Sequence, residues 1–171
     1  MKFYGVTMRT VLRVGAILLL TGCGGFQRHS ERECMERAMY FESNRSSRDG
    51  MVAVGTVVMN RVRSGDYPRS VCGVVSQKGQ FAPGIMSRKM NDRSVPLVRE
   101  AAASVMRGER HPMVGNAQFF HAASYRASYN NMHYVLVAGG NAFYERRKPA
   151  LVTRPYPPAP IEGMTGRRGW R

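Results

Sequence analysis

The chain has 171 residues, 43% of them hydrophobic, and a formal net charge of +15. This length fits one ordinary domain, and the excess of basic residues is typical of proteins that bind nucleic acid or another anionic polymer or surface. A merely solvated basic surface would have the same composition. We find no nucleic-acid recognition motif, and the four histidines show no metal-ligand spacing. We therefore expect no nucleic-acid partner, no metal and no cofactor.

The first residues have the pattern of an export signal. Residues 1–13 carry three basic and no acidic residues, residues 14–20 are apolar, and small residues precede Cys23. This order is typical of secretory signals, and the apolar run is much shorter than the roughly 20 residues of a permanent membrane helix. A buried helix at the start of the chain is the alternative interpretation.

The sequence Leu20-Thr21-Gly22-Cys23 resembles the lipobox of bacterial lipoproteins. The resemblance implies a signal peptide over residues 1–22 and a lipidated tether over residues 23–30, because such proteins are cleaved before the cysteine and acylated on it. Several acyl chains on one residue give stable anchoring. We expect an exported, membrane-anchored protein facing the periplasm. Gly24 replaces an aspartate that favours inner-membrane retention, so the outer membrane is preferred.

Cys34 and Cys72 are the cysteines that remain once Cys23 is assigned to the lipid anchor. In an oxidising compartment, an even number of cysteines normally forms disulfides. We predict a bond between Cys34 and Cys72, with two free thiols as the alternative.

Apolar spacing predicts a mainly helical domain. Residues 31–42 place apolar side chains at three- and four-residue intervals, as helices do. Residues 51–59 form a longer apolar run, which ends in Asn60-Arg61-Val62 and is closed by Ser64-Gly65-Asp66, and its β-branched residues would also suit a strand. Its length, and a capping box formed by Ser46 and Asp49, favour a helix. Two shorter helical patterns follow, over residues 70–76 and 95–107.

The second half of the chain predicts a β-hairpin and a disordered tail. Residues 134–137 and 142–144 are apolar and flank the turn Gly139-Gly140-Asn141. Five of the nine prolines lie in residues 149–160 and the chain end is basic, so residues 149–171 are predicted to be disordered. Asn60 and Arg61 are interpreted as structural residues that close the long helix.

Glu42 is the candidate catalytic residue, because it ends the apolar and aromatic segment Ala38-Met39-Tyr40-Phe41. A carboxyl group held against apolar walls has a raised pKa, which a general acid needs near neutral pH. The alternative is a solvated glutamate, which is the commoner state at a helix end.

Seven stretches resemble, in order, the SleB-like cell wall hydrolases, typified by the catalytic domain of spore cortex-lytic enzymes. They are Ala38-Met39-Tyr40-Phe41-Glu42, residues 49–62, Tyr67-Pro68, Val74-Val75-Ser76-Gln77, Gln80-Phe81-Ala82, Phe120-His121 and Phe143-Tyr144. The resemblance implies a single lysozyme-like, lytic transglycosylase-like domain over residues 31–148. This fold is mainly α with a small β-hairpin (α+β). It also implies cleavage of peptidoglycan glycan strands, with Glu42 as the catalytic glutamate.

Three residues depart from the family pattern: Ser46 replaces a second glutamate, Met51 a glutamine and Asn141 a histidine. Hydrolysis by two carboxylates needs a partner for the acid, and neither Glu36 nor Asp49 is a convincing one. Lytic transglycosylation needs a single acid, so we expect that reaction. A non-catalytic wall-binding lipoprotein that has lost activity is the alternative.

Five further residues are candidates for substrate binding. Gln80 offers hydrogen bonds to sugar hydroxyl or N-acetyl groups, His121 would orient substrate or a neighbouring backbone group, and Tyr40, Phe81 and Tyr144 offer apolar faces. Ordinary core packing is the alternative for each aromatic ring. The expected partners are peptidoglycan strands and, through the lipid anchor, the membrane; the protein is expected to be a monomer.

Overall fold

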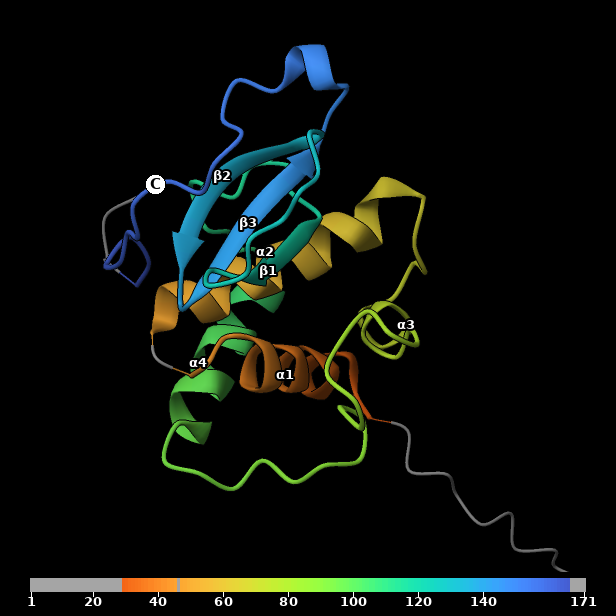
Figure 1. The fold of residues 1–171 in the computed structure, drawn as a ribbon. Coiled ribbons are helices and arrows are strands. Elements are labelled where there is room, and N and C mark those ends of the chain that lie inside the picture. Colours follow the sequence, from red (N-terminus) through yellow and green to blue (C-terminus); the bar gives the residue numbers. More distant parts are fainter. Residues whose placement is uncertain (1–28, 46, 167–171) are drawn as a thin grey trace, which may run out of the picture.

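The computed structural model describes residues 29–45 and 47–166 (Figure 1). The predicted signal peptide, Cys23 and most of the tether therefore lie outside the described residues. The elements in chain order are α1 (Glu31–Glu42), α2 (Arg48–Ser64), α3 (Val71–Val75), α4 (Val95–Met106), β1 (Phe119–Ala122), β2 (Met132–Ala138), β3 (Asn141–Arg146) and a 3-10 turn (Pro149–Leu151). This order confirms the predicted mainly helical α+β fold. In the described part of the chain, no helix is long and apolar enough to cross a membrane.

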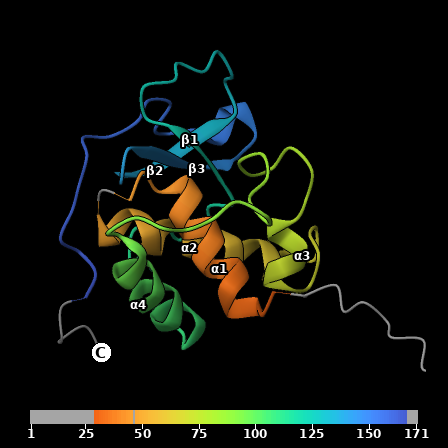
Figure 2. The same cartoon turned by 90° about the horizontal axis from the view of Figure 1, so that it is seen from below.

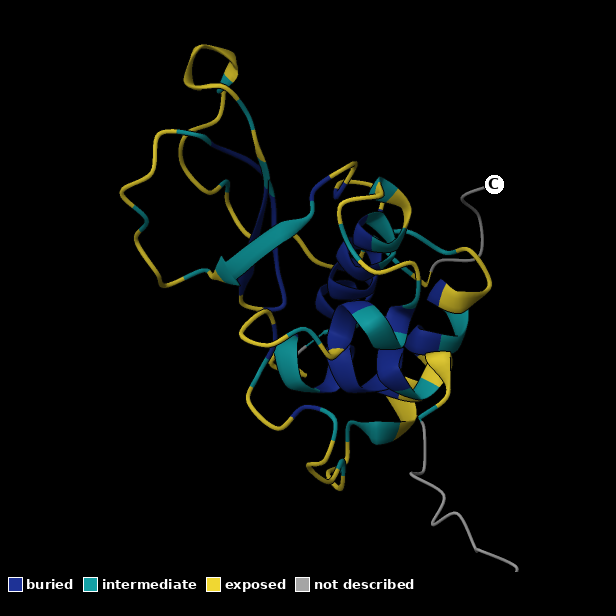
Figure 3. Ribbon diagram, turned by 90° about the vertical axis from the view of Figure 1, so that its right-hand side faces the viewer, coloured by how far each residue is buried: buried dark blue, intermediate teal, exposed yellow. Residues whose placement is uncertain are grey.

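The core forms where α1, α2 and α4 pack against one another, with α3 packed on α1 and α2 (Figure 2). Every residue from 49 to 58 of α2 is buried, which explains why its apolar run is continuous rather than confined to one face. At Gly55 the helices are so close that a Cβ atom would lie 2.4 Å from Met39 Cε on α1. Figure 3 shows the buried residues gathered in these helices and in strands β2 and β3, with most of the exposed residues in the loops.

The sheet has three antiparallel strands in the order β1-β3-β2. The predicted hairpin is confirmed as β2 and β3, with Val137 opposite Ala142, while β1, which pairs Phe120 with Phe143, was not predicted. The connecting residues Gly139 and Gly140 have φ angles of +55° and +77°, as the tight hairpin turn requires. The turn also packs on the start of α2, because a Cβ atom on Gly139 would lie 2.6 Å from the Cα atom of Gly50.

Residues 149–166 are ordered, so the predicted disorder is wrong for this part of the tail. They run beside β2, where Tyr134 N–H donates to the Arg154 carbonyl at 3.0 Å and Ile161 N–H donates to the Val137 carbonyl at 3.0 Å. The Glu162 carboxylate accepts the Gly139 N–H at 2.8 Å. Prolines suit such a position at a sheet edge, because they lack only the donor that faces away from the strand. Residues 167–171 lie outside the described residues.

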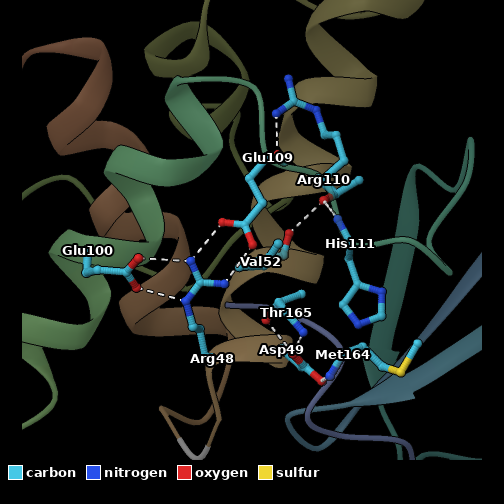
Figure 4. A network of polar contacts seen from close by, with 10 residues as sticks. Arg48, Asp49, Val52, Glu100, Glu109, Arg110, His111, Met164 and Thr165 are labelled. Carbon is cyan, nitrogen blue, oxygen red and sulfur yellow. Dashed lines mark hydrogen bonds and ion pairs between the residues drawn. The ribbon is translucent and has the colours of Figure 1, made fainter. Parts of the chain in front are cut away.

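Asp49 binds the end of this tail rather than completing a capping box (Figure 4). Ser47 is the N-cap of α2, and its hydroxyl accepts the Gly50 N–H at 3.1 Å; the predicted cap residue Ser46 lies outside the described residues. The Asp49 carboxylate accepts the N–H groups of Met164 at 2.7 Å and Thr165 at 2.8 Å, and also the Thr165 hydroxyl. Burial opposes ionisation of Asp49, but these hydrogen bonds outweigh it and hold its pKa below the ordinary value.

We expect Asp49→Asn to lower the free energy of unfolding at pH 7 by about 2 kcal/mol, because the amide cannot accept all the bonds that the carboxylate does. A carboxyl group whose pKa is lower in the folded than in the unfolded protein stabilises the fold at pH values above its unfolded-state pKa. The deficit should therefore shrink as the pH falls below 3.8, the ordinary value. Urea unfolding at pH 7 and pH 3 measures this effect, with the exposed Asp66→Asn as the control. A deficit independent of pH would contradict the assignment.

Candidate active site

Glu42 is the last residue of α1, and two distant segments hold it in place. Its carboxylate accepts the Ala82 N–H at 2.6 Å, and its backbone carbonyl accepts the side-chain amide of Asn141, the first residue of β3, at 2.6 Å. In the sequence, Asn141 was noticed as part of the predicted hairpin turn and as a departure from the family pattern. In the structure it fixes the helix end that carries the candidate acid.

Glu42 opens into a cavity of about 390 Å³, here called the Glu42 cavity. Its lining residues are Glu42, Arg61, Gly79, Gln80, Phe81, Ala82, Phe120, His121, Ala122 and Asn141. Four of the residues chosen from the sequence, Glu42, Gln80, Phe81 and His121, thus meet at one place. Glu42 is the one acidic residue among the described residues that line it. Within residues 29–45 and 47–166, no cluster of three His, Cys, Asp or Glu side chains is placed to hold a metal ion.

The environment of Glu42 favours its protonated form. Burial of the carboxyl group raises its pKa, while the Ala82 N–H and the positive charge of Arg61 oppose this shift without cancelling it. A raised pKa is one requirement for a carboxyl group that donates a proton to a leaving oxygen, and Glu42 meets it.

Arg61 is a site residue as well as a structural one. The helix continues to Ser64 and ends at Gly65, so the interpretation that Asn60 and Arg61 close it is wrong. Arg61 is 4% exposed, and its Nε–H donates to the Gln118 carbonyl at 2.8 Å. Its guanidinium lies 5.4 Å from the Phe81 ring centroid. Its buried Nη1 has no hydrogen-bond partner among the described residues, and Arg61 is one of the residues that line the Glu42 cavity.

His121 lies on β1 and is fixed at both ring nitrogens. Nδ1 lies 2.8 Å from the Ala122 carbonyl, and Nε2 lies 2.8 Å from the Tyr134 hydroxyl. The neutral ring protonated on Nδ1 satisfies both contacts, since Nδ1–H then donates to the carbonyl and Nε2 accepts from the hydroxyl. His121 is therefore held in one orientation in the wall of the Glu42 cavity.

Two of the predicted aromatic faces belong to the core instead. Tyr40 is 4% exposed and Tyr144 is 8% exposed, and neither lines the Glu42 cavity. Tyr40 packs edge-on against Phe41, and Tyr144 stacks on Phe119 of the neighbouring strand. The core-packing alternative holds for both rings.

Tyr125 is an exposed ring that the sequence analysis missed. It is 55% exposed, and its centroid lies 5.3 Å from that of His121 in an edge-to-face arrangement. The ring therefore stands beside a residue of the Glu42 cavity. Its position shortly after Phe120-His121 was the one sequence signal that could have indicated a ring near the site. Apolar spacing could not reveal that this ring is exposed in a loop.

Comparison with known proteins gives the family of this chain. The model of a family described as cell wall hydrolases matches residues 45–144. This segment is more than half of the chain, and the chain belongs to that family of enzymes. The matched segment begins just after Glu42 and contains every other residue that lines the Glu42 cavity. No curated protein matches the chain.

Two solved structures share the fold. The catalytic domain of the germination-specific lytic transglycosylase SleB from Bacillus anthracis is 25% identical with a TM-score of 0.56, and the alignment covers 70% of this chain and 98% of that one. The catalytic domain of the Bacillus cereus SleB protein is 25% identical with a TM-score of 0.57, covering 70% of this chain and 94% of that one. The chain is thus a SleB-like member of the family, and the predicted architecture is confirmed.

Proposed function

We propose that this protein cleaves the glycan backbone of peptidoglycan by lytic transglycosylation, with Glu42 as its single catalytic acid. The observation that carries the proposal is the position of Glu42, half-buried and with a raised pKa as the one acidic residue lining the cavity. Membership in the cell wall hydrolase family and similarity to a protein described as a lytic transglycosylase support the substrate and the reaction.

In the proposed reaction Glu42 first donates its proton to the glycosidic oxygen, and the bond from that oxygen to the anomeric carbon breaks. The 6-hydroxyl oxygen of the same muramic acid residue then attacks the anomeric carbon, and its proton passes to the Glu42 carboxylate. The acid is regenerated and no water is consumed. In this proposal the side chains of Arg61 and Gln80, which line the Glu42 cavity, would bind sugar oxygens during these steps.

The lack of a second acid favours this reaction over hydrolysis. Two-carboxylate glycosidases place their carboxyl groups about 5 to 9.5 Å apart, across the scissile bond. Glu42 has no such partner among the described residues that line its cavity. A substrate hydroxyl can do what the missing nucleophile or base would do.

Product analysis on purified cell walls tests the proposal. Transglycosylation leaves 1,6-anhydro-muramic ends, whereas hydrolysis leaves reducing ends that are heavier by one water, and mass spectrometry separates them. Reducing ends would refute transglycosylation as the mechanism but would still show that the protein is a glycosidase. Binding to walls without any soluble product would instead support the non-catalytic alternative.

We expect Tyr125→Ala to raise KM for glycan strands about 5- to 10-fold while leaving kcat within a few-fold. An exposed aromatic ring beside the Glu42 cavity offers a flat apolar face to a sugar ring, and losing one such contact costs about 1 kcal/mol. Steady-state rates on solubilised glycan strands measure the effect. Tyr156→Ala is the control, because Tyr156 is 81% exposed and lines none of the described cavities. A change confined to kcat would contradict a binding role.

We also propose that the protein is an exported lipoprotein, anchored through Cys23 with its domain facing the periplasm and acting as a monomer. The sequence Leu20-Thr21-Gly22-Cys23 supports the anchor, and Gly24 supports placement in the outer membrane. We expect Cys23→Ser to abolish acylation and to leave the precursor uncleaved. Metabolic labelling with a palmitate analogue measures this, and a mutant that still incorporates label would refute the assignment.

A further inference from the structure

A second cavity, of about 490 Å³, lies between α2 and the segment that leads into β1. Its lining residues are Thr56, Asn60, Arg63, Ser64, Arg110, His111, Pro112, Gly115, Asn116 and Gln118, and it is called the arginine cavity here. Among the described residues that line it, two are arginines and none is acidic.

The charges of Arg63 and Arg110 are not neutralised within the described part of the chain. Neither forms an ion pair there, although eight such pairs occur elsewhere. The nearest acid in sequence, Glu109, is committed to Arg48, which donates to both of its carboxylate oxygens at 2.7 Å (Figure 4).

Arg110 is held rigidly but is incompletely bonded. Its Nη1 donates to the carbonyls of Val105 at 2.8 Å and Glu109 at 2.6 Å, which anchors the guanidinium at the end of α4. Its buried Nε has no partner among the described residues. Burial lowers the pKa of Arg110, and the charge of Arg63 lowers it further, which places two like charges near each other. An anion bound between them would relieve this repulsion.

The arginine cavity and the Glu42 cavity are lined by residues that are neighbours in the chain. Asn60 and Arg61 are consecutive on α2, and they line the arginine cavity and the Glu42 cavity respectively. Gln118 and Phe120 likewise line different cavities, and positions two residues apart in a chain are at most about 7 Å apart. The Asn60 amide donates to the carbonyls of Gly115 at 2.9 Å and Ala117 at 2.8 Å, which fixes the segment between the cavities.

We propose that the arginine cavity binds a carboxylate of the peptide stem that peptidoglycan carries on its muramic acid residues. This inference rests on the proposed function, in which the glycan lies in the Glu42 cavity. Two or three stem residues span about 7 to 10 Å, at least as far as Gln118 of one cavity lies from Phe120 of the other along the chain. Arginine suits this ligand, because its planar donors match the two oxygens of a carboxylate. The enzyme would therefore prefer glycan strands whose stems are intact.

The test measures binding without turnover, using full-length Glu42→Gln protein and soluble glycan fragments with and without their stems. We expect the stem-bearing fragment to bind about 10-fold tighter, the effect of one charge-assisted hydrogen bond. Adding Arg63→Ala should remove most of this preference. The variant should fold, since Arg63 is exposed. Arg69→Ala, at an exposed arginine that lines none of the described cavities, should keep the preference.

Equal affinity for the two fragments, or an unchanged preference in Arg63→Ala, would overturn the stem proposal. Arg110→Gln is the second variant, and its melting temperature shows whether a lost preference reflects misfolding. These outcomes are independent of whether the proposed glycosidase activity is confirmed. If the protein cleaves cell walls but binds both fragments equally, only the proposed role of the arginine cavity is refuted. If it prefers stem-bearing fragments but never cleaves walls, only the proposed reaction is refuted.

Discussion

Replacing Glu42 with glutamine should lower the rate of glycan cleavage at least about 100-fold, the lower end for loss of a general acid. Glutamine keeps the shape of the side chain and can still accept the Ala82 N–H, which the carboxylate accepts at 2.6 Å. It cannot donate a proton to the leaving oxygen. Release of soluble muropeptides from purified walls measures the rate.

Glu36→Gln is the matched control for this substitution. Glu36 lies on the same helix, is 8% exposed and bonds to Arg32 at 3.1 Å, but it does not line the Glu42 cavity. Its variant should stay within a few-fold of the wild-type rate. If Glu42→Gln kept full activity, the site assigned here would be wrong.

The pKa of Glu42 gives this variant a second signature. Because the folded-state pKa is raised above the ordinary 4.5, ionisation of Glu42 opposes folding. Wild-type stability therefore falls as the pH rises from the unfolded pKa to the folded pKa, and the loss persists above that. Glu42→Gln should be at least as stable as wild type at pH 7, with the difference vanishing below pH 4.5. Such a pattern is typical of a site in which function is favoured over stability.

The helices of this fold were predictable because their signals are local. Apolar spacing marked α1, and the glycine at position 65 marked the end of α2. The residues of the Glu42 cavity were predictable only through the family resemblance. Glu42, Gln80 and His121 come from three segments far apart in the sequence, and no local pattern indicates that they meet.

The wrong predictions share one physical cause: each concerns a feature that is determined by contacts between residues far apart in the sequence. Tyr144 was expected to face substrate because its neighbour Phe119 on β1 was not recognised as part of a strand. The tail was expected to be disordered from its prolines and charges, but Asp49 and Gly139 bind it from distant parts of the chain. Arg61 was assigned to the helix end because nothing near it in the sequence reveals the cavity beside it.

Cys34 and Cys72 are bonded in the structure, with their Cα atoms 5.1 Å apart, so the predicted disulfide is confirmed. The bond joins α1 to α3, and the loop after α3 carries Gln80, Phe81 and the Ala82 N–H that binds Glu42. A second link runs alongside it, since the Glu31 carboxylate accepts the N–H groups of Val71 and Cys72. The disulfide therefore supports the fold and the wall of the Glu42 cavity together.

Removing this bond with the double substitution Cys34→Ala and Cys72→Ala should lower the free energy of unfolding by about 4 kcal/mol. The value follows from the loss of chain entropy that a sequence separation of 38 residues imposes on the unfolded state. Activity should fall as well, because the segment that holds the Glu42 carboxyl group loses its covalent link to α1. Urea unfolding with and without a reductant measures the effect. The reductant should destabilise the wild type and leave the double variant unchanged, whereas equal stability of the oxidised wild type and the variant would show that the Glu31 contacts suffice to hold α3 in place.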